Sequence, residues 1–399
     1  MRGHKASVTS STWQSTLVFG AGVSAALHLW KLVPALPQLQ NTLSLTIMQA
    51  GWMISVFQLA GMLLGMPLGL LIPRFGLKRS ILTGLYILSA TSFVGAFCQH
   101  ATALLLLRIV EGMALLLVTM AAPGVMREVA PKEKIHFFMS LWSAYIPTAT
   151  MLALFVGAVM LMVTNWNILW IACGILSLVF ATLVHRHITF VHPCAETDGL
   201  TLSRIWQRLK GVLSVKICWL LALTFSMYTS QWVAIISFLP LIYQQAGISG
   251  VLMGFCTALA AGVNIIGNLL AGKLLQRGIA PHRLLFIAFA TMIVTAYIAF
   301  ALDATLSIQL LAISLFSAAG GLAPATLFNL AVKIPASAYD TAPVVGWLQQ
   351  WISAGQFFGP IMVAGWVDYT HGWQNVWLLT GAWGAMGIVF TLMLRRSSV

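Results

Sequence analysis

Apolar residues occur in runs of about twenty along the chain, and short polar breaks separate the runs. An α-helix rises about 1.5 Å per residue, so each run can cross the hydrocarbon core of a bilayer, which is about 30 Å thick. The pattern predicts twelve membrane-spanning helices, near residues 14–36, 47–71, 80–98, 101–125, 136–162, 167–185, 216–244, 249–275, 283–302, 305–330, 342–367 and 373–394. The predicted fold is therefore an all-α polytopic membrane protein.

The composition excludes the soluble classes of protein. The chain has 399 residues, of which 60% are hydrophobic and 7% charged, and its mean hydropathy is +0.93. A formal charge of +13 would suggest nucleic acid in a soluble protein, but here the cations lie in short loops between apolar runs. With the N-terminus inside, every Lys and Arg except Lys31 and Arg108 falls on the cytoplasmic side, as the positive-inside rule requires. We therefore expect both termini in the cytoplasm, a bacterial inner-membrane location, contacts with lipid and no nucleic-acid partner.

The two exceptions belong to a candidate site. Lys31 shares a helix face with His28, and Arg108 shares one with Glu111, because each pair is three residues apart. Counted from the predicted outer helix ends, the four side chains lie at similar depths, about 8–15 Å from the surface. Ionisable groups inside a membrane helix are costly and by default mark a functional site. Their formal charges sum to +1 with His28 neutral, which favours an anionic substrate, while Glu111 can exchange a proton.

Three structural alternatives stay open for these residues. Arg108 and Glu111 could form an ion pair that only joins helices. Lys31 could extend its long side chain to the membrane surface instead of facing the protein interior. A lone histidine such as His28 is often a hydrogen-bonded packing residue.

The second half of the chain repeats the first at an offset of about 203 residues. Arg74, near the end of the second run, recurs as Arg277 near the end of the eighth. Parallel repeats of this kind occur in transporters whose substrate site lies between the two halves. The predicted units are an N-terminal six-helix half, residues 1–190, a cytoplasmic linker, 191–215, and a C-terminal six-helix half, 216–399.

The second half has no charged residue at the depth of the candidate site. At the position that corresponds to His28 it has Gln231, which has aromatic neighbours in the seventh run. Hydrogen bonds and stacking from this half could orient a substrate while the first half supplies charge. The candidates for that role are Tyr228, Gln231, Trp232 and Asn329.

The stretch after the second run, predicted to be a loop, reads GLLIPRFGLKR from Gly69 to Arg79. It resembles the Gly-x-Leu-x-Asp-Arg-x-Gly-Arg-Arg motif of the major facilitator superfamily of secondary transporters. The residues that agree with this conformational motif include Gly69, Arg74, Gly76, Lys78 and Arg79. Pro73 stands where the family has an acid, so the charge network that latches one conformation in the family lacks that acid here.

A second resemblance lies in the fourth run. Arg108, Gly112 and Ala114 are similar to the family's fourth-helix pattern, Arg-x-x-x-Gly-x-Gly, whose arginine is implicated in proton coupling. Within the superfamily, the runs HLWKLVPALP, RIVEG and YIPTA most resemble bacterial cyanate-permease-like transporters, and the last of them makes Tyr145 a further candidate for substrate contact. The fifth-helix Gly-Pro signature of drug antiporters is absent, whereas GQFFGPIMVAG in the eleventh run resembles its second-half counterpart.

The resemblance implies two pseudo-symmetric six-helix bundles and transport by alternating access. We expect proton-coupled uptake of a small anionic solute by a monomer. A drug or metabolite exporter that exchanges its substrate for protons is the first alternative, and a non-transporting membrane sensor on the same scaffold is the second. The sequence has no enzyme signature, no cofactor motif and no metal-ligand pattern.

Overall fold

The computed structural model describes most of the chain, and for a few helical residues, 70, 73, 74, 332, 333 and 341–343, it describes the backbone alone. The described residues are 11–134, 138, 141–142, 144–188, 206, 210–248, 250–302, 304–333 and 341–396. Most of the predicted linker, 191–215, therefore lies outside the described residues, as does the start of the fifth predicted run.

The described chain forms twelve helical spans, six in each half. Those of the first half are α1 (Thr12–Trp30) with α2 (Leu32–Leu43), α3 (Ile47–Ser55) with the 3₁₀ turn η1 (Val56–Gln58) and α4 (Leu59–Phe75), α5 (Leu77–Ala96), α6 (Ala101–Val129), α8 (Tyr145–Val163) and α9 (Trp166–His187). Those of the second half are α11 (Lys216–Gln245), α12 (Gly250–Gln276), α13 (Pro281–Phe300), α14 (Leu306–Gly320) with α15 (Leu322–Lys333), α16 (Thr341–Thr370) and α17 (Val376–Arg396). Ten of these spans are long and apolar enough to cross a membrane, and α5 and α16 complete the predicted twelve.

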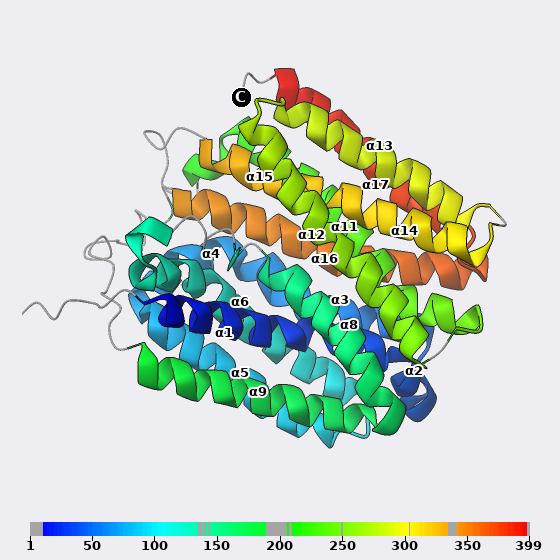
Figure 1. Cartoon of the computed structure of the whole chain (residues 1–399), viewed down its shortest axis with the longest axis horizontal. Coiled ribbons are helices and arrows are strands. Elements are labelled where there is room, and N and C mark those ends of the chain that lie inside the picture. Colours follow the sequence, from blue (N-terminus) through cyan, green and yellow to red (C-terminus); the bar gives the residue numbers. More distant parts are fainter. Residues whose placement is uncertain are drawn as a thin grey trace, which may run out of the picture.

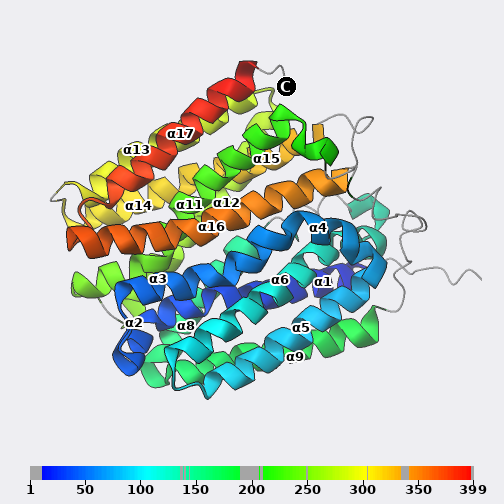
Figure 2. The same ribbon diagram turned by 180° about the vertical axis from the view of Figure 1, so that it is seen from behind.

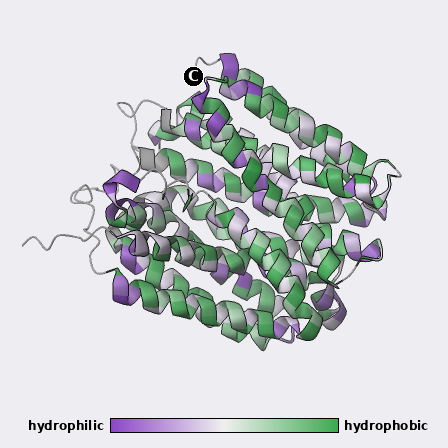
Figure 3. Ribbon diagram, in the orientation of Figure 1, coloured by the Kyte–Doolittle hydropathy of each residue, from purple (hydrophilic) through white to green (hydrophobic). Residues whose placement is uncertain are grey.

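The helices of each half pack into one bundle, and the two bundles lie side by side (Figure 1). The start of α1 and the end of α17 lie at the same end of the molecule, as an even number of spans requires. Hydrophobic ribbon dominates the middle of the helices, whereas hydrophilic segments gather toward their ends (Figure 3). This distribution is the one expected for a bundle that crosses a bilayer.

The most extensive contacts between the halves involve α16 and α12. α16 lies along α3 and α4 (Figure 2), and α12 lies along α8 (Figure 1). The N–H of Met66 in α4 donates to the side-chain oxygen of Gln350 in α16 at 3.3 Å. Gly254 in α12 has no side chain to separate that helix from Ala158 in α8. Small residues at such contacts allow membrane helices to approach closely.

The first span differs from its prediction. α1 ends at Trp30, and after a turn at Lys31 the chain continues as α2 to Leu43 rather than ending near residue 36. Pro34 lies in the first turn of α2, where its missing N–H is tolerated because the helix breaks just before it. Since α2 adds 12 residues, or about 18 Å of helix, Lys31 lies deeper below the outer helix end than the predicted 8 Å or so.

The predicted loop from Gly69 to Arg79 is wrong in extent. α4 continues to Phe75 and α5 begins at Leu77, so the turn is made by Gly76 alone, whose φ is +90°. Glycine has no Cβ to oppose that left-handed backbone, which is why one residue suffices. Pro73 therefore lies in the last turn of α4 and not in a loop.

Candidate functional site

The structure brings together the four ionisable residues that the sequence placed at similar depths, which we name the charged cluster: His28, Lys31, Arg108 and Glu111. One carboxylate oxygen of Glu111 lies 2.6 Å from Lys31 Nζ, and the other lies 2.9 Å from Arg108 Nη1. His28 Nδ1 is 3.5 Å from the first oxygen. All four residues are at most 1% exposed. The alternative in which Lys31 reaches the membrane surface is therefore wrong for this conformation.

Lys31 uses all three of its ammonium donors inside the protein. Besides Glu111, Nζ donates to Ser92 Oγ at 2.7 Å and to His28 Nδ1 at 3.1 Å. The ring of Trp170 covers the ammonium from a fourth direction, with its centroid 4.7 Å away. Such complete satisfaction is what makes a buried ammonium tolerable.

The contacts of Lys31 also fix the tautomer of His28. An ammonium can only donate, so Nδ1 is an acceptor and the neutral imidazole carries its proton on Nε2. Nε2 then donates to Ser177 Oγ in α9 at 2.8 Å, and the Ser177 hydroxyl lies 3.0 Å from that of Ser24. The imidazole is thus held by Lys31 on one side and by Ser177 of α9 on the other.

Arg108 binds the end of a helix as well as a carboxylate. Its guanidinium donates to the carbonyl oxygens of His28 and of Leu29, the latter at 3.1 Å. These carbonyls belong to the last turn of α1, where the break at Lys31 leaves backbone acceptors without their usual helical partners. The negative end of the α1 dipole also favours a cation there. Arg108 therefore stabilises the break that separates α1 from α2.

A close helix approach positions Arg108. A Cβ at Gly112 would overlap the carbonyl oxygen of Phe57, so only glycine lets α6 lie this close to η1. The approach places the Phe57 ring 4.3 Å from the guanidinium carbon of Arg108 and brings the carbonyl of Met53 within 3.5 Å of its Nε. Gly112 of the predicted fourth-helix pattern thus allows the close approach that holds Arg108 of the same pattern in place.

Two of the second-half candidates form a neutral polar network. Asn264 in α12 donates to the hydroxyl of Tyr228 at 3.0 Å and to the carbonyl of Ser317 at 2.8 Å. Trp232 donates from Nε1 to the hydroxyl of Ser317 at 2.8 Å. The ring of Trp232 packs edge-on against Trp30, with centroids 5.6 Å apart. Since Trp30 directly precedes Lys31, this pair connects the second-half network to the edge of the charged cluster.

The remaining candidates do not join the cluster. Gln231 donates to the Met227 carbonyl of its own helix at 3.0 Å, and its buried side-chain oxygen has no partner. Tyr145 stacks on Trp142, with ring centroids 4.4 Å apart. Asn329 is exposed on α15. Depth along a helix could not separate these residues from the others, because it does not tell which way a side chain points.

The sequence did not indicate the hydroxyl and aromatic partners of the cluster, Ser24, Ser92, Ser177 and Trp170. Serine is common in membrane helices, and an apolar run gives no sign of what it contacts. One signal existed, since Ser92 and Ser177 recur 203 residues later as Thr295 and Thr380.

The conformational motif is only partly described. Lys78 donates to the His185 carbonyl at the end of α9 at 3.0 Å, and Arg79 is exposed. Gly69 lies within α4, Gly76 makes the turn, and the side chain of Arg74 lies outside the described part. The second half has a similar turn, in which Gly278 has a φ of +82°.

Comparison with known proteins agrees with this architecture. The family model described as Major Facilitator Superfamily matches residues 17–360. A tetracenomycin C resistance and export protein of Streptomyces glaucescens is 23% identical over 156 residues, which are 39% of this chain and 29% of that protein. The chain thus matches well under two thirds of that relative's length.

Two solved structures share the fold over nearly their whole length. A D-xylose-proton symporter superposes with a TM-score of 0.74 at 17% identity, covering 95% of this chain and 96% of the symporter. A bacterial homologue of the human lysosomal transporter Spinster, in an inward-facing and unoccupied conformation, also gives 0.74 at 16% identity, covering 97% and 98%. At these identities the likeness extends to the fold alone.

Proposed function

The chain belongs to the Major Facilitator Superfamily, and on that premise we propose that it takes up a small anionic solute together with protons. It is a multi-pass membrane transporter rather than an enzyme. In the proposed cycle the two halves, residues 1–190 and 216–399, expose a site between them to each side of the membrane in turn, and the 191–215 linker joins them.

The observation that carries the proposal is that Lys31 and Arg108 share a single buried carboxylate. With His28 neutral, the two cations and Glu111 leave a formal charge of +1 inside the bundle. A net charge away from water is costly, and an anion that reaches the cluster reduces that cost. The cluster therefore favours an anionic solute, or a solute with one anionic group.

The same geometry links the anion to a proton. Protonation of Glu111 removes its charge, raises the formal charge of the cluster from +1 to +2 and releases the Nζ donor of Lys31. The cluster then attracts an anion more strongly than before. Proton and anion thus promote each other's binding, and by linkage the effect is reciprocal. Mutual promotion is the requirement for symport, whereas an exchanger needs the two to compete.

The second half would supply orientation rather than charge. Tyr228 and Trp232 are held by Asn264 and Ser317, and the Trp30–Trp232 contact adjoins the cluster. The donor Nε1 of Trp30 is buried and has no partner among the described residues, so it is free to bind a substrate acceptor. Roles for Gln231, Tyr145 and Asn329 stay predictions.

Export by proton exchange is a second candidate function. It is favoured by the similarity to the tetracenomycin C resistance and export protein and by the GQFFGPIMVAG run of α16. The two directions differ in the sign of proton movement, because an added anion carries protons with it in symport and drives them the opposite way in exchange.

The test is proton movement in liposomes that contain the purified protein and a pH-sensitive dye. A panel of small anions, with neutral and cationic analogues, is added outside. We expect at least one anion to acidify the interior of the liposomes. In Glu111→Gln, which keeps the shape but cannot release a proton, this acidification should be lost, while exchange of labelled for unlabelled anion should continue.

Glu133→Gln is the matched control, because Glu133 is an exposed carboxylate outside the cluster. It should acidify the liposomes as the wild type does. Full acidification in Glu111→Gln would mean that Glu111 only pairs with Arg108 and that another group carries the proton. Alkalinisation by the anion in the wild type would favour the exporter instead.

We further propose placement in a bacterial inner membrane with both termini in the cytoplasm, because nearly all Lys and Arg residues fall on one side of the spans. Reporter fusions after Arg79 and at the C-terminus should report cytoplasm, and fusions near Asn41 and Ala304 the outside. A cytoplasmic signal near Asn41 would contradict this topology.

A further inference from the structure

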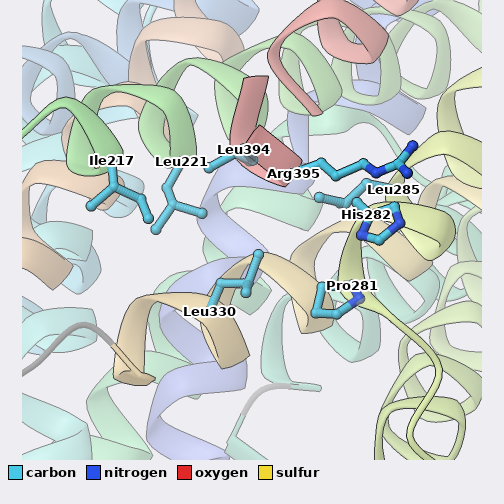
Figure 4. A pocket seen from close by; sticks show the side chains of 8 residues that line it. All are labelled: Ile217, Leu221, Pro281, His282, Leu285, Leu330, Leu394 and Arg395. Atoms are coloured by element: carbon cyan, nitrogen blue, oxygen red, sulfur yellow. The ribbon is translucent and has the colours of Figure 1, made fainter. Parts of the chain in front are cut away.

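A pocket in the second half lies apart from the charged cluster, where α11 and α13 begin and α17 ends (Figure 4). It is a shallow hollow that opens to the surface, and its empty volume of about 310 Å³ includes the open space at its mouth. Its wall is mostly aliphatic, while its rim carries a histidine and an arginine, drawn on the same side of the pocket in Figure 4. The residues that matter are Leu221, Leu285, Leu330 and Leu394 in the wall and His282 and Arg395 on the rim.

The rim concentrates positive charge that no carboxylate of the described residues neutralises. Arg395 and Arg283 both act electrostatically on His282, so two cations lie near this histidine. None of the three forms an ion pair with a carboxylate among the residues that the structure describes. Like charges repel, and a bound anion between them relieves that repulsion.

Backbone dipoles act in the same direction. Pro281 is at the first position of α13, and Ile217 is the second residue of α11, so two helix N-termini border the pocket. Each helix N-terminus presents the positive end of its helix dipole. Both add to the attraction that the basic side chains exert on a phosphate.

The place of the pocket in the bundle points to the source of that phosphate. The pocket lies at the end of the molecule where α11 begins with Lys216 and α17 ends with Arg396. Basic residues gather there at the level of the lipid headgroups. Leu221 and Leu285 in the wall are fully buried, whereas Leu330 and Leu394 keep 4% and 5% of their surface exposed. An aliphatic surface of this kind offers nothing to a free phosphate ion but suits the first carbons of an acyl chain.

We propose that this pocket binds an anionic phospholipid, with the phosphate between His282 and Arg395 and the start of an acyl chain against the leucine wall. Basic pockets between membrane helices bind anionic lipid headgroups by the same physics. A lipid held here would bridge α13 and α17 and so stabilise the packing of the second half.

The experiment uses the purified full-length protein in detergent and measures its apparent melting temperature as lipid is added. The probes are phosphatidylglycerol, phosphatidylcholine with the same acyl chains, glycerol 3-phosphate and inorganic phosphate. Native mass spectrometry counts the lipids retained by each variant. We expect phosphatidylglycerol to raise the melting temperature more than phosphatidylcholine does, because a ligand that binds the native state stabilises it.

The variants are His282→Gln, Arg395→Gln and the double variant, each compared with its own lipid-free melting temperature. The concentration of phosphatidylglycerol for half of the effect should rise on the order of fivefold in Arg395→Gln and by less in His282→Gln, because an imidazole is mostly neutral at pH 7. Arg186→Gln is the matched control, since Arg186 is an exposed arginine at the end of α9 in the other half. It should respond as the wild type does.

Three results would overturn the proposal. The first is an equal response to phosphatidylcholine and phosphatidylglycerol, which would mean that binding does not depend on the charge of the headgroup. The second is an unchanged response of the double variant, which would place the lipid elsewhere. The third is a full effect of glycerol 3-phosphate or inorganic phosphate, which would make the site one for a soluble anion.

Discussion

In the first half, Ser92 and Ser177 bond to side chains of a neighbouring helix, whereas 203 residues later Thr295 and Thr380 bond to carbonyl oxygens of their own helices. A serine or threonine hydroxyl in a membrane helix turns back to its own backbone when nothing better is in reach. The same positions in the two bundles are therefore used differently because only the first contains ionised partners.

The difference begins with two residues of the first span in each half. Lys31 and His28 correspond to Ala234 and Gln231, so the second bundle lacks both the ammonium and the imidazole. Its core is joined instead by the neutral network around Asn264. Two bundles of similar fold can therefore differ in chemistry, with the ionisable residues in the first half and neutral hydrogen bonds in the second.

The largest difference in stability should follow from removing charge. Arg108→Leu leaves Glu111 with Lys31 alone and strips the carbonyls of His28 and Leu29 of their donor. Breaking a buried ion pair on one side costs about 3–5 kcal/mol. We expect the free energy of unfolding to fall by that amount, measured by SDS titration of the protein in mixed micelles with circular dichroism as the readout.

Gln231→Leu is the matched change in the second half. It removes a buried amide whose oxygen has no described partner, so the free energy of unfolding should change by less than about 1 kcal/mol. Equal losses in the two variants would show that the halves do not differ in the way their cores are held.

The hydropathy pattern and the ionisable residues predicted a large part of this architecture. Twelve spans and the meeting of the charged cluster were predictable, because a charge inside an apolar helix must find a partner. The break at Lys31 has a local cause, because Pro34 has no N–H to bond the carbonyl of Trp30, but its capping by the distant side chain of Arg108 was not predictable. The hydroxyl partners were missed for a similar reason, because which neighbour a serine faces depends on how the helices pack.

An intermediate effect should follow from adding one methyl group to α6. Gly112→Ala forces α6 away from the Phe57 carbonyl and displaces Arg108 from the end of α1. Overpacking of this kind costs about 1–3 kcal/mol. The loss should appear in the same unfolding assay, together with weaker anion-driven proton movement.

Gly272→Ala in α12 is the control for that change. Nothing lies within 4 Å of a Cβ built at Gly272, so the variant should be neutral or slightly more stable, by less than about 1 kcal/mol. If Gly112→Ala is equally harmless, the approach of α6 to η1 is not what positions Arg108.

The smallest effect tests the hydroxyl comparison itself. Ser92→Ala leaves one donor of Lys31 and the carbonyl of Trp170 without their partner, whereas Thr295→Val removes a hydroxyl that bonds only its own helix. Hydrogen bonds between membrane helices average about 0.6 kcal/mol, so we expect a loss of about 1 kcal/mol for the first variant, where the donor is charged, and about 0.5 kcal/mol or less for the second.

Single variants this close in energy are best separated by double-mutant cycles, because a cycle cancels what each change does on its own. Combining Ser92→Ala with Lys31→Met should give a coupling energy of about 1 kcal/mol. In Lys31→Met the Ser92 hydroxyl has already lost its bond to the ammonium, so removing the hydroxyl as well costs less than it does in the wild type. Combining Thr295→Val with Gln231→Leu should give none, because no contact joins those two side chains among the described hydrogen bonds. Equal coupling in the two cycles would mean that Thr295 also interacts with the side chain of Gln231 on a neighbouring helix. The two halves would then differ only in the charged residues that the first half contains.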